Sequence, residues 1–429
     1  MELNEELRSL AEFAKNLSVD SQISESVFRD FSVLISRGDR TVILAGEEGE
    51  KYTEIVSSIY QAVSTRRPVS KRSVSDLVGS FLLRVVNVGV GQQDAPAEDA
   101  EAALRELKTA LFENPKDWEV RLVVEGLAPS GLPSTVGQVH FEYLDDGSLS
   151  KLKDRVFEMI KNMRVKDGDA AIAHMSNNLA VLLGKTTGVL TVSAVDDEAA
   201  IQAAKHKMQT TVDAINFFAS REQMGGWVFL PGDTMPQTEF VLAICEKEER
   251  ITPSFRRAGP MRQLPLNQIA NRKGFARVSG ILAKEAPPSL EERILASLQW
   301  AGRAQVEARR EEAFLLYAIA LESLLLGRDT KTEISHRLAV RCAHLGGGPT
   351  ANDKKRVVRE ILSLYETRSR IVHSGNFLVS DAELALIKEY SVLTLFVVID
   401  AEPFRSMTEV RELEQWFETQ LLSGGISRT

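Results

Sequence analysis

The chain has 429 residues and a mass of 47.5 kDa, which is long enough for two or three domains with separate cores. Its composition, 44% hydrophobic and 26% charged residues, is that of an ordinary soluble protein. No apolar run approaches the roughly 20 residues of a membrane helix, so we expect no membrane partner. The net charge of −8 argues against a protein that coats nucleic acid by bulk electrostatics, but it permits an enzyme with a local basic site.

The two cysteines and the first residues of the chain bear on the cellular compartment of the protein. Cys245 and Cys342 lie in apolar surroundings, which favours buried thiols in a reducing environment over a disulfide scaffold. The acidic start, Met1–Glu6, is not typical of a secretory signal. We therefore expect a cytoplasmic protein.

Residues 1–115 are predicted to form a mostly helical N-terminal region. Apolar residues recur at helical spacing in several stretches, whereas one short apolar run indicates a strand. The predicted helices are 7–17, 52–63, 74–86 and one from Glu101 to Asn114, the strand is Arg40–Ala45, and 89–99 is a loop or linker.

Residues 116–288 are predicted to form an α/β domain with a sensor or regulatory role. Alternating apolar residues predict strands at 118–125, 136–143, 188–195, 227–230 and 238–245. Helical patterns cover 152–163, 170–183 and 198–219, and Asp196 is an expected N-cap for the last of these. A proline-containing connector is expected from 256 to 289.

Residues 289–429 are predicted to be all-α, with five or six helices in a bundle. No strand pattern occurs in this third of the chain. Three Ser-x-x-Glu capping boxes are each expected to open a helix: Ser289/Glu292, Ser380/Glu383 and Ser406/Glu409.

One helical stretch of this region, Leu364–Gly375, carries an arginine and a histidine at a fixed spacing. Arg368 precedes His373 by five residues, a step that turns a straight helix about 140° beyond a full turn. The two side chains therefore converge only if His373 lies in a frayed last turn, where Ser374–Asn376 bends the chain. There the negative end of the helix dipole favours an imidazolium, which suits a proton donor.

This Arg-x4-His pattern resembles the signature of the HEPN superfamily, whose catalytic members are metal-independent endoribonucleases. The preceding segments, 311–326 and 333–345, resemble the ApeA-like branch, and the resemblance covers about residues 290 to 429. The segment that begins at Val195 resembles the companion domain that ApeA-like proteins often carry. The predicted fold class is a multidomain α/β (α+β) N-terminal and middle region, from the patterns above, followed by the HEPN bundle that the resemblance implies. The resemblance also implies a homodimer that forms through the bundle and needs no cofactor or metal.

By the same resemblance, two protomers place Arg368 and His373 across a two-fold axis. His373 would then serve as general acid or base, and Arg368 would hold the scissile phosphate and stabilise its extra charge. Ser369 stands where the family most often has Asn, Asp or His, which is a departure from its pattern, and its hydroxyl can still orient a phosphate or the histidine. Arg370 is either a second phosphate contact or a solvated charge.

Glu322 interrupts the apolar helix Phe314–Leu326 and needs a partner if it is buried. In the family a glutamate at such a place often pairs with the motif arginine, and the alternative is a plain structural ion pair. A basic stretch with interleaved aromatic residues is either an RNA guide or a solvated linker. Its candidate RNA-binding residues are Arg256, Arg257, Arg262, Arg272, Lys273 and Arg277.

The resemblance implies a defence or toxin endoribonuclease that cleaves tRNA or other structured RNA and responds to a phage-derived or other trigger. The product should carry a 2′,3′-cyclic phosphate. The alternative is a non-catalytic HEPN protein for dimerisation and for binding a ligand or partner. A metal-dependent nuclease is disfavoured because no paired carboxylates stand at ligand spacing. His336 and His344 do not complete a metal site with Cys342, so we interpret them as core or surface histidines.

Overall fold

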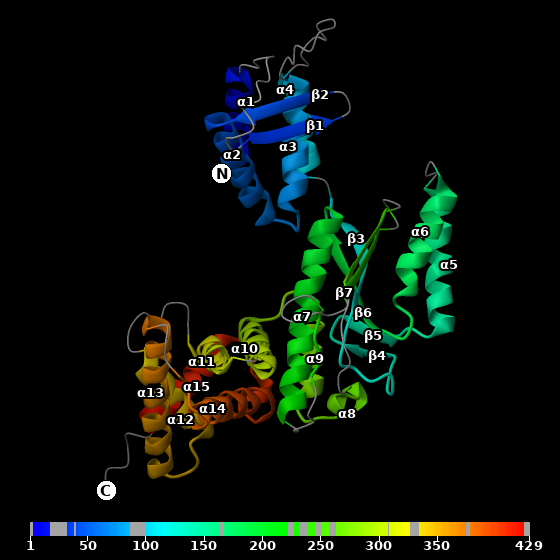
Figure 1. Ribbon diagram of the computed structural model, residues 1–429. Coiled ribbons are helices and arrows are strands. Elements are labelled where there is room, and N and C mark those ends of the chain that lie inside the picture. Colours follow the sequence, from blue (N-terminus) through cyan, green and yellow to red (C-terminus); the bar gives the residue numbers. More distant parts are fainter. Residues whose placement is uncertain are drawn as a thin grey trace, which may run out of the picture. The chain divides into compact units, whose positions relative to one another are not determined.

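The computed structural model divides into two compact units, which we describe separately (Figure 1). Unit 1 comprises Met1–Val120, Thr191–Ala204 and Ala243–Thr252, and unit 2 comprises Arg121–Leu190, Lys205–Leu242 and Pro253–Thr429. The structure describes residues 3–17, 32–37, 40–85, 100–112, 114–163, 167–221, 227–231, 239–245, 247, 250–256, 263–307, 309–326, 334–374 and 378–423.

The N-terminal part of unit 1 packs helices against a two-stranded hairpin. Its elements are α1 (Leu3–Asn16), β1 (Ser32–Arg37), β2 (Arg40–Ala45), α2 (Glu47–Ser64), α3 (Lys71–Val85) and α4 (Ala100–Leu111). The strands pair antiparallel, and fully buried side chains such as Leu10, Leu44 and Ile59 form the core. α3 lies close to β1 because Gly79 has no side chain; a Cβ there would stand 2.8 Å from Ile35 Cγ2.

The expected helices and the strand Arg40–Ala45 are confirmed, whereas β1 was not predicted. The predicted loop or linker at 89–99 lies outside the described residues.

A six-stranded sheet follows, in the order β4-β5-β6-β3-β7-β8. Its strands are β3 (Lys116–Val123), β4 (Ser134–Val136), β5 (Val139–Tyr143), β6 (Thr186–Ala194), β7 (Glu239–Cys245) and β8 (Arg250–Arg256). The prediction of one strand at 136–143 is wrong, because the chain reverses between β4 and β5, which pair antiparallel. Gly137 makes the turn with a φ of +60°, a conformation that L side chains rarely adopt.

Two further corrections concern the middle region. The predicted strand 227–230 makes only an isolated antiparallel bridge between Phe229 and Glu125. The expected connector 256–289 contains two short helices, α8 (Leu266–Ala270) and α9 (Phe275–Leu282), and β8 reaches its first residue. Short elements of five to eight residues give too few repeats for a clear periodicity.

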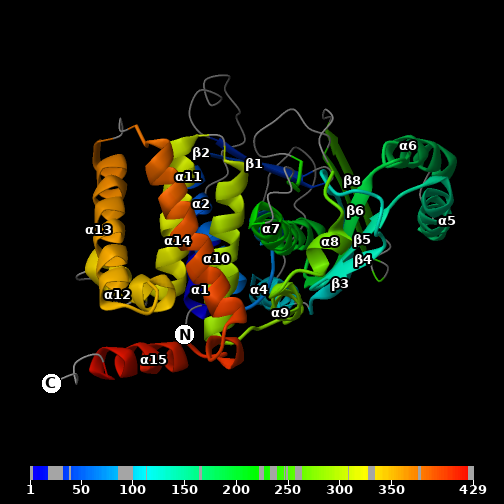
Figure 2. The ribbon, with the colours of Figure 1, turned by 90° about the horizontal axis from the view of Figure 1, so that it is seen from below.

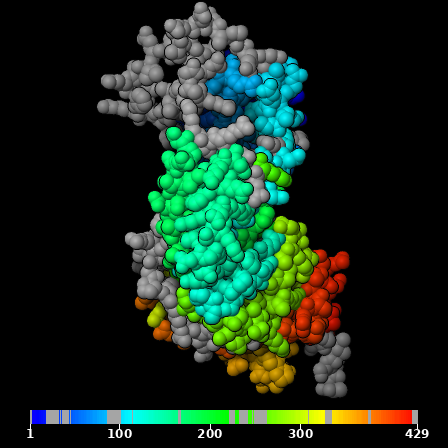
Figure 3. Space-filling view, turned by 90° about the vertical axis from the view of Figure 1, so that its right-hand side faces the viewer, coloured from blue at the N-terminus to red at the C-terminus, as the bar shows by residue number. Residues whose placement is uncertain are grey.

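Three longer helices accompany the sheet: α5 (Asp146–Asn162), α6 (Gly168–Ala180) and α7 (Asp197–Arg221). The N-cap prediction is confirmed, since Asp196 Oδ1 accepts the amide of Ala199 at 2.9 Å. In unit 2, α7 approaches β6 because Gly188 leaves room for Met208, whose Cε would stand 2.5 Å from a Cβ at position 188. α7 lies on one side of the sheet in Figures 1 and 2, and α5 and α6 lie on the other, with their outer face visible in Figure 3.

The last third of the chain is helical throughout its described part, as predicted. It contains α10 (Ser289–Val306), α11 (Arg310–Leu325), α12 (Ile334–Gly346), α13 (Ala351–Ser374), α14 (Asp381–Asp400), the 3-10 turn η3 (Phe404–Ser406) and α15 (Val410–Ser423). α11 packs against α10 and α14, and α12 packs against α13 (Figure 2). The coarse prediction of an α+β region followed by helices therefore holds, while the three domain boundaries stay a prediction.

Only one of the three expected capping boxes forms. Ser380 and Glu383 cap α14 reciprocally. Ser289 instead lies inside α10, where its Oγ accepts the amide of Val410 at 3.0 Å and so caps α15. Ser406 Oγ donates to the Pro403 carbonyl at 2.9 Å within η3. The Ser-x-x-Glu pattern therefore does not predict a capping box where the serine hydroxyl forms its hydrogen bond with a different element.

Both cysteines are free and buried, as expected. Among the described residues, no helix combines the length and apolar character needed to cross a membrane. Burial raises the pKa of the Cys342 thiol to about 12, so this sulfur stays protonated near neutral pH.

Candidate functional site

The Arg-x4-His motif lies in the last two turns of α13, which continues without a break from Arg368 to Ser374. His373 is thus in the last turn, as predicted, whereas most of the expected bend lies outside the described residues. In an unbroken helix the two side chains point about 140° apart. No hydrogen bond or ion pair joins Arg368 to His373 in the part of the chain that the structure describes, so α13 alone does not bring them together.

Arg368 is held instead by Glu322 of α11. Its Nε lies 3.4 Å from Glu322 Oε1, and the two side chains are 33% and 24% exposed. The Nε atom itself is buried and makes no well-directed hydrogen bond, so the contact is an ion pair. Arg368 is therefore the charged partner that Glu322 needs, because the rest of its helix is apolar.

Tyr365 completes this cluster. Its hydroxyl donates to Glu322 Oε1 at 3.0 Å and fixes the carboxylate in front of the arginine. Burial, followed by the charge of Glu322, raises the pKa of Tyr365 well above its ordinary value. The tyrosine is therefore a neutral donor that orients Glu322, and it is unsuited to act as a base.

A second polar cluster connects α13 with the start of α14. The buried Thr367 donates to Glu383 Oε1 at 2.8 Å and accepts from Arg370 Nη2 at 3.0 Å. The pKa of Glu383 is lowered, first by hydrogen bonds from Ser380 and then by Thr367 and Arg370. Arg370 is exposed, but it is anchored beside this cluster and is not simply a solvated charge.

The remaining residues around the motif face solvent. Ser369 and His373 are exposed, and among the described residues His373 has no hydrogen-bond partner. Two large apolar side chains near it are also exposed, Val372 by 51% and Leu378 by 86%. An exposed histidine beside exposed apolar groups makes this end of α13 accessible to another molecule.

The best-described residue of the predicted RNA-binding stretch, Arg277, bonds to the end of α14 and not to the motif. Arg277 donates to the carbonyls of Val398 and Ile399, both at 2.8 Å, and to those of Phe404 and Met407. It thereby caps the C-terminal end of α14, about 20 Å along that helix from Glu383. Burial lowers the pKa of Arg277, and its carbonyl contacts leave few donors for RNA.

Two other residues of that stretch, Lys273 and Arg272, are described with their side chains. Lys273 is exposed and pairs with Asp400 at 3.2 Å, and Arg272 is half-buried. Arg257 and Arg262 lie outside the described residues, and nothing is described of the side chain of Arg256 on β8. Their RNA-binding role stays a prediction.

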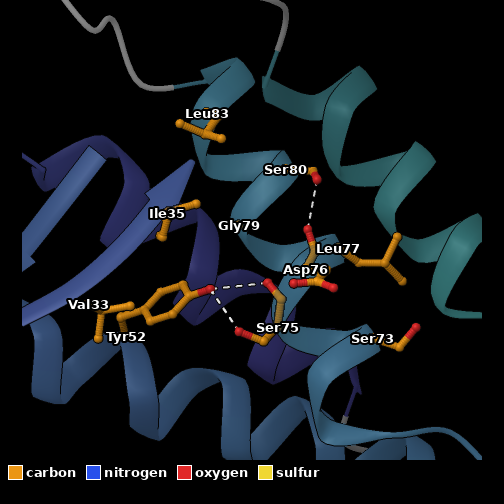
Figure 4. A pocket seen from close by; sticks show the side chains of 10 residues that line it. All are labelled: Val33, Ile35, Tyr52, Ser73, Ser75, Asp76, Leu77, Gly79, Ser80 and Leu83. Carbon is orange, nitrogen blue, oxygen red and sulfur yellow. Dashed lines mark hydrogen bonds between the residues drawn. The ribbon is translucent and has the colours of Figure 1, made fainter. Parts of the chain in front are cut away.

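A pocket of 540 Å³ in unit 1 lies between β1, α2 and α3 (Figure 4). Tyr52 donates to the Ser75 carbonyl at 3.1 Å and lies 3.4 Å from its Oγ. Burial raises the pKa of Tyr52, and Asp76 is the one charged residue among those that line the pocket. This lining provides no paired acid and base and no basic group for a phosphate.

Sequence reasoning missed Tyr365 and Thr367 as site residues. Thr367 follows Leu364 by three residues and therefore lies on the buried face of α13, which was a readable signal for a buried polar group with a partner. Within the described ranges, no group of three or more His, Cys, Asp or Glu residues is placed to hold a metal ion.

Comparison with known proteins adds no assignment. No protein-family model matches this chain, and neither a curated protein nor a solved structure is significantly similar to it. The geometry around α13 is therefore the basis for assigning a function to this chain.

Proposed function

We propose that the chain is a HEPN-type, metal-independent endoribonuclease that acts as a homodimer. The observation that carries this proposal is the contrast within one motif: Glu322 anchors Arg368, whereas His373 is exposed at the end of the same helix. An anchored cation and an accessible imidazole are the two groups that metal-free RNA cleavage requires.

The proposed reaction uses the 2′-hydroxyl of RNA as nucleophile. A neutral His373 takes the hydroxyl proton while the 2′-oxygen forms a bond to phosphorus. The bond to the 5′-oxygen breaks, and this leaving group takes a proton from water, so one histidine and one arginine suffice. The products are a 2′,3′-cyclic phosphate and a 5′-hydroxyl. Arg368 stabilises the extra negative charge that develops on the phosphate oxygens.

The helix geometry supports a dimer in this proposal. Because Arg368 and His373 point about 140° apart on α13, a second copy would bring the arginine of one chain and the histidine of the other to one phosphate. The exposed Val372 and Leu378 are close to the motif in sequence and offer apolar surface for such a contact.

The contact with Glu322 suits a positioning role. It engages Arg368 through Nε, which leaves the two Nη groups for a phosphate. In this proposal Tyr365 holds Glu322, Glu322 holds Arg368, and Arg368 meets the substrate. Ser369 and Arg370 lie beside it as further candidate phosphate contacts.

A second candidate function is a non-catalytic module for dimerisation and partner binding. The same ion pair favours it, because Glu322 already compensates the charge of Arg368. In either case the α/β region would be the sensor, tRNA or another structured RNA a candidate target, and a phage-derived or other signal the trigger. Antiphage defence in the cytoplasm is the setting we propose.

The test is cleavage of a small-RNA pool in EDTA by the wild type and by His373→Ala. We expect cleavage with cyclic-phosphate ends by the wild type and at least a hundredfold loss in the variant, since general acid–base catalysis contributes about 10²- to 10⁴-fold. His174→Ala, which removes an exposed histidine from α6, is the control and should cleave normally. Equal cleavage by all three proteins would remove the motif from the mechanism.

A further inference from the structure

Unit 2 has a pocket between α12 and α13, far from the Arg-x4-His motif. Its volume is 680 Å³, within the usual range for small-molecule sites. Lys355, which lines it, precedes Arg368 by thirteen residues, or about 20 Å along α13. The pocket is therefore separate from the candidate active site.

The polar lining of this pocket is basic. The residues with polar side chains are His336, His344, Asn352, Lys354, Lys355 and Arg359. No carboxylate is among the lining residues, although the whole chain has a net charge of −8. The lining of this pocket is therefore positively charged, whereas the chain as a whole is negatively charged. We call it the basic pocket.

Helical spacing explains how the chain gathers these groups. On α12, His336, Val340 and His344 are four residues apart and share one face. On α13, Lys355 and Arg359 are likewise four residues apart. Because α12 packs against α13, the two faces meet, and three apolar residues lie among the basic groups: Val340, Ala343 and Val358.

His344 and Lys354 are close together within the basic pocket. Lys354 Nζ lies 3.5 Å from His344 Nδ1. Burial, and then the charge of Lys354, lowers the pKa of His344, so the imidazole is less readily protonated than an ordinary histidine. An anion bound between them would offset the positive charge of Lys354 and favour the protonated form of His344.

The nearest carboxylates on α13 are engaged elsewhere. Asp353 accepts from Thr350 Oγ1 at 2.5 Å and from its amide at 3.3 Å, and so caps the helix. Glu360 accepts a hydrogen bond from the Tyr390 hydroxyl. Among the described residues, His336, Lys355 and Arg359 form no ion pair.

We propose that the basic pocket binds phosphate groups, carried either by a small polyphosphate-bearing ligand or by an RNA backbone. Arg359 offers a planar fork and Lys354 and Lys355 offer ammonium charges, which together suit several phosphate oxygens. The pocket opens at the first turns of α13, where the helix dipole adds to the attraction for anions. This proposal does not depend on RNA cleavage.

The test is calorimetric titration of the full-length protein with inorganic tripolyphosphate at low salt. Lys355→Glu combined with Arg359→Glu should weaken binding at least tenfold relative to the wild type. The control is Lys71→Glu combined with Arg72→Glu, which makes the same change in charge at two exposed positions of α3 and should stay within twofold of the wild type. His344→Gln is a milder variant that should weaken binding without adding negative charge.

A second arm uses a single-stranded RNA oligonucleotide at matched phosphate concentration. If the Lys355/Arg359 variant loses RNA affinity as well, the phosphates are those of RNA. If only tripolyphosphate affinity is lost, the ligand is a small phosphorylated molecule. The proposal is overturned if the wild type binds neither probe, or if the α3 control weakens binding as much as the pocket variants do.

Discussion

Helix α13 carries basic side chains at both ends, and the two groups have different neighbours. At the C-terminal end, Arg368 contacts Glu322 and Arg370 contacts Thr367 next to Glu383. At the N-terminal end, Lys355 and Arg359 line the basic pocket, and no carboxylate is among its lining residues. The basic side chains at the C-terminal end are therefore held by contacts within the protein, whereas those at the N-terminal end are open to an anion.

The largest stability effect is expected at Glu322. Glu322→Ala leaves the buried Arg368 Nε without its counter-charge, and it leaves the Tyr365 hydroxyl only the longer hydrogen bond to the Ala318 carbonyl at 3.5 Å. Because the pair is partly exposed, we expect a loss of about 2 kcal/mol in the free energy of unfolding, measured by urea titration. Glu312→Ala, at a more exposed position of α11, is the control. A loss at Glu322 no larger than at Glu312 would mean that Arg368 is not anchored.

Thr367→Val should have the next largest effect. The substitution keeps the volume but removes the hydroxyl that donates to Glu383 and accepts from Arg370. A buried hydrogen bond of this kind contributes about 1 kcal/mol, with more at stake when a charged partner is left behind. Urea unfolding should show a loss of about 1 to 2 kcal/mol. An unchanged midpoint would show that this cluster does not fix the end of α13.

Ser380→Ala should lower stability by about 1 kcal/mol, because it removes the reciprocal cap of α14. The effect should depend on pH. Since the pKa of Glu383 is lowered from 4.5 in the folded state, its contribution is complete above the unfolded pKa and is lost as pH falls through the lower, folded pKa. The difference between wild type and variant should therefore shrink in acid.

Ser406→Ala is the matched control for this cap, because Ser406 belongs to the same sequence pattern but caps no α-helix. A change within about 0.5 kcal/mol is expected for it at every pH. A loss at Ser406 equal to that at Ser380 would contradict the corrected assignment of the capping boxes.

The smallest effect is expected at the open end of α13. Lys355→Ala removes a charge with no ion-pair partner among the described residues, so the free energy of unfolding should change by less than about 0.5 kcal/mol. Thermal unfolding in low salt would measure it. A clear destabilisation would show that Lys355 has a structural partner. The basic side chains at both ends of α13 would then be held by contacts within the protein.

The sequence predicted long elements well and short or long-range features poorly. Apolar periodicity located α7, α11 and α13, each of which spans four turns or more. It did not distinguish the hairpin of β4 and β5 from one strand, because alternation continues through the turn at Gly137. It also missed α9, which is too short to show a helical period, and β8, whose internal Pro253 argues against a strand.

The candidate site was predictable only where the signal was local. The need of Glu322 for a partner could be read from its apolar helix, but the sequence did not say that Tyr365 would hold it. Arg277 looked like an RNA contact because its neighbours are basic, whereas its hydrogen bonds go to carbonyls more than a hundred residues away. The basic pocket depends on α12 packing against α13, which no local pattern encodes.

The central claim is that Arg368 and His373 of two copies form one active site, and mixing of inactive variants tests it most directly. Arg368→Ala and His373→Ala would be combined, allowed to exchange subunits, and compared with each variant alone in RNA cleavage in EDTA. We predict that the mixture recovers activity well above either parent, because mixed dimers hold an intact arginine on one copy and an intact histidine on the other. No recovery, while affinity tags show that mixed dimers do form, would contradict a site shared between protomers.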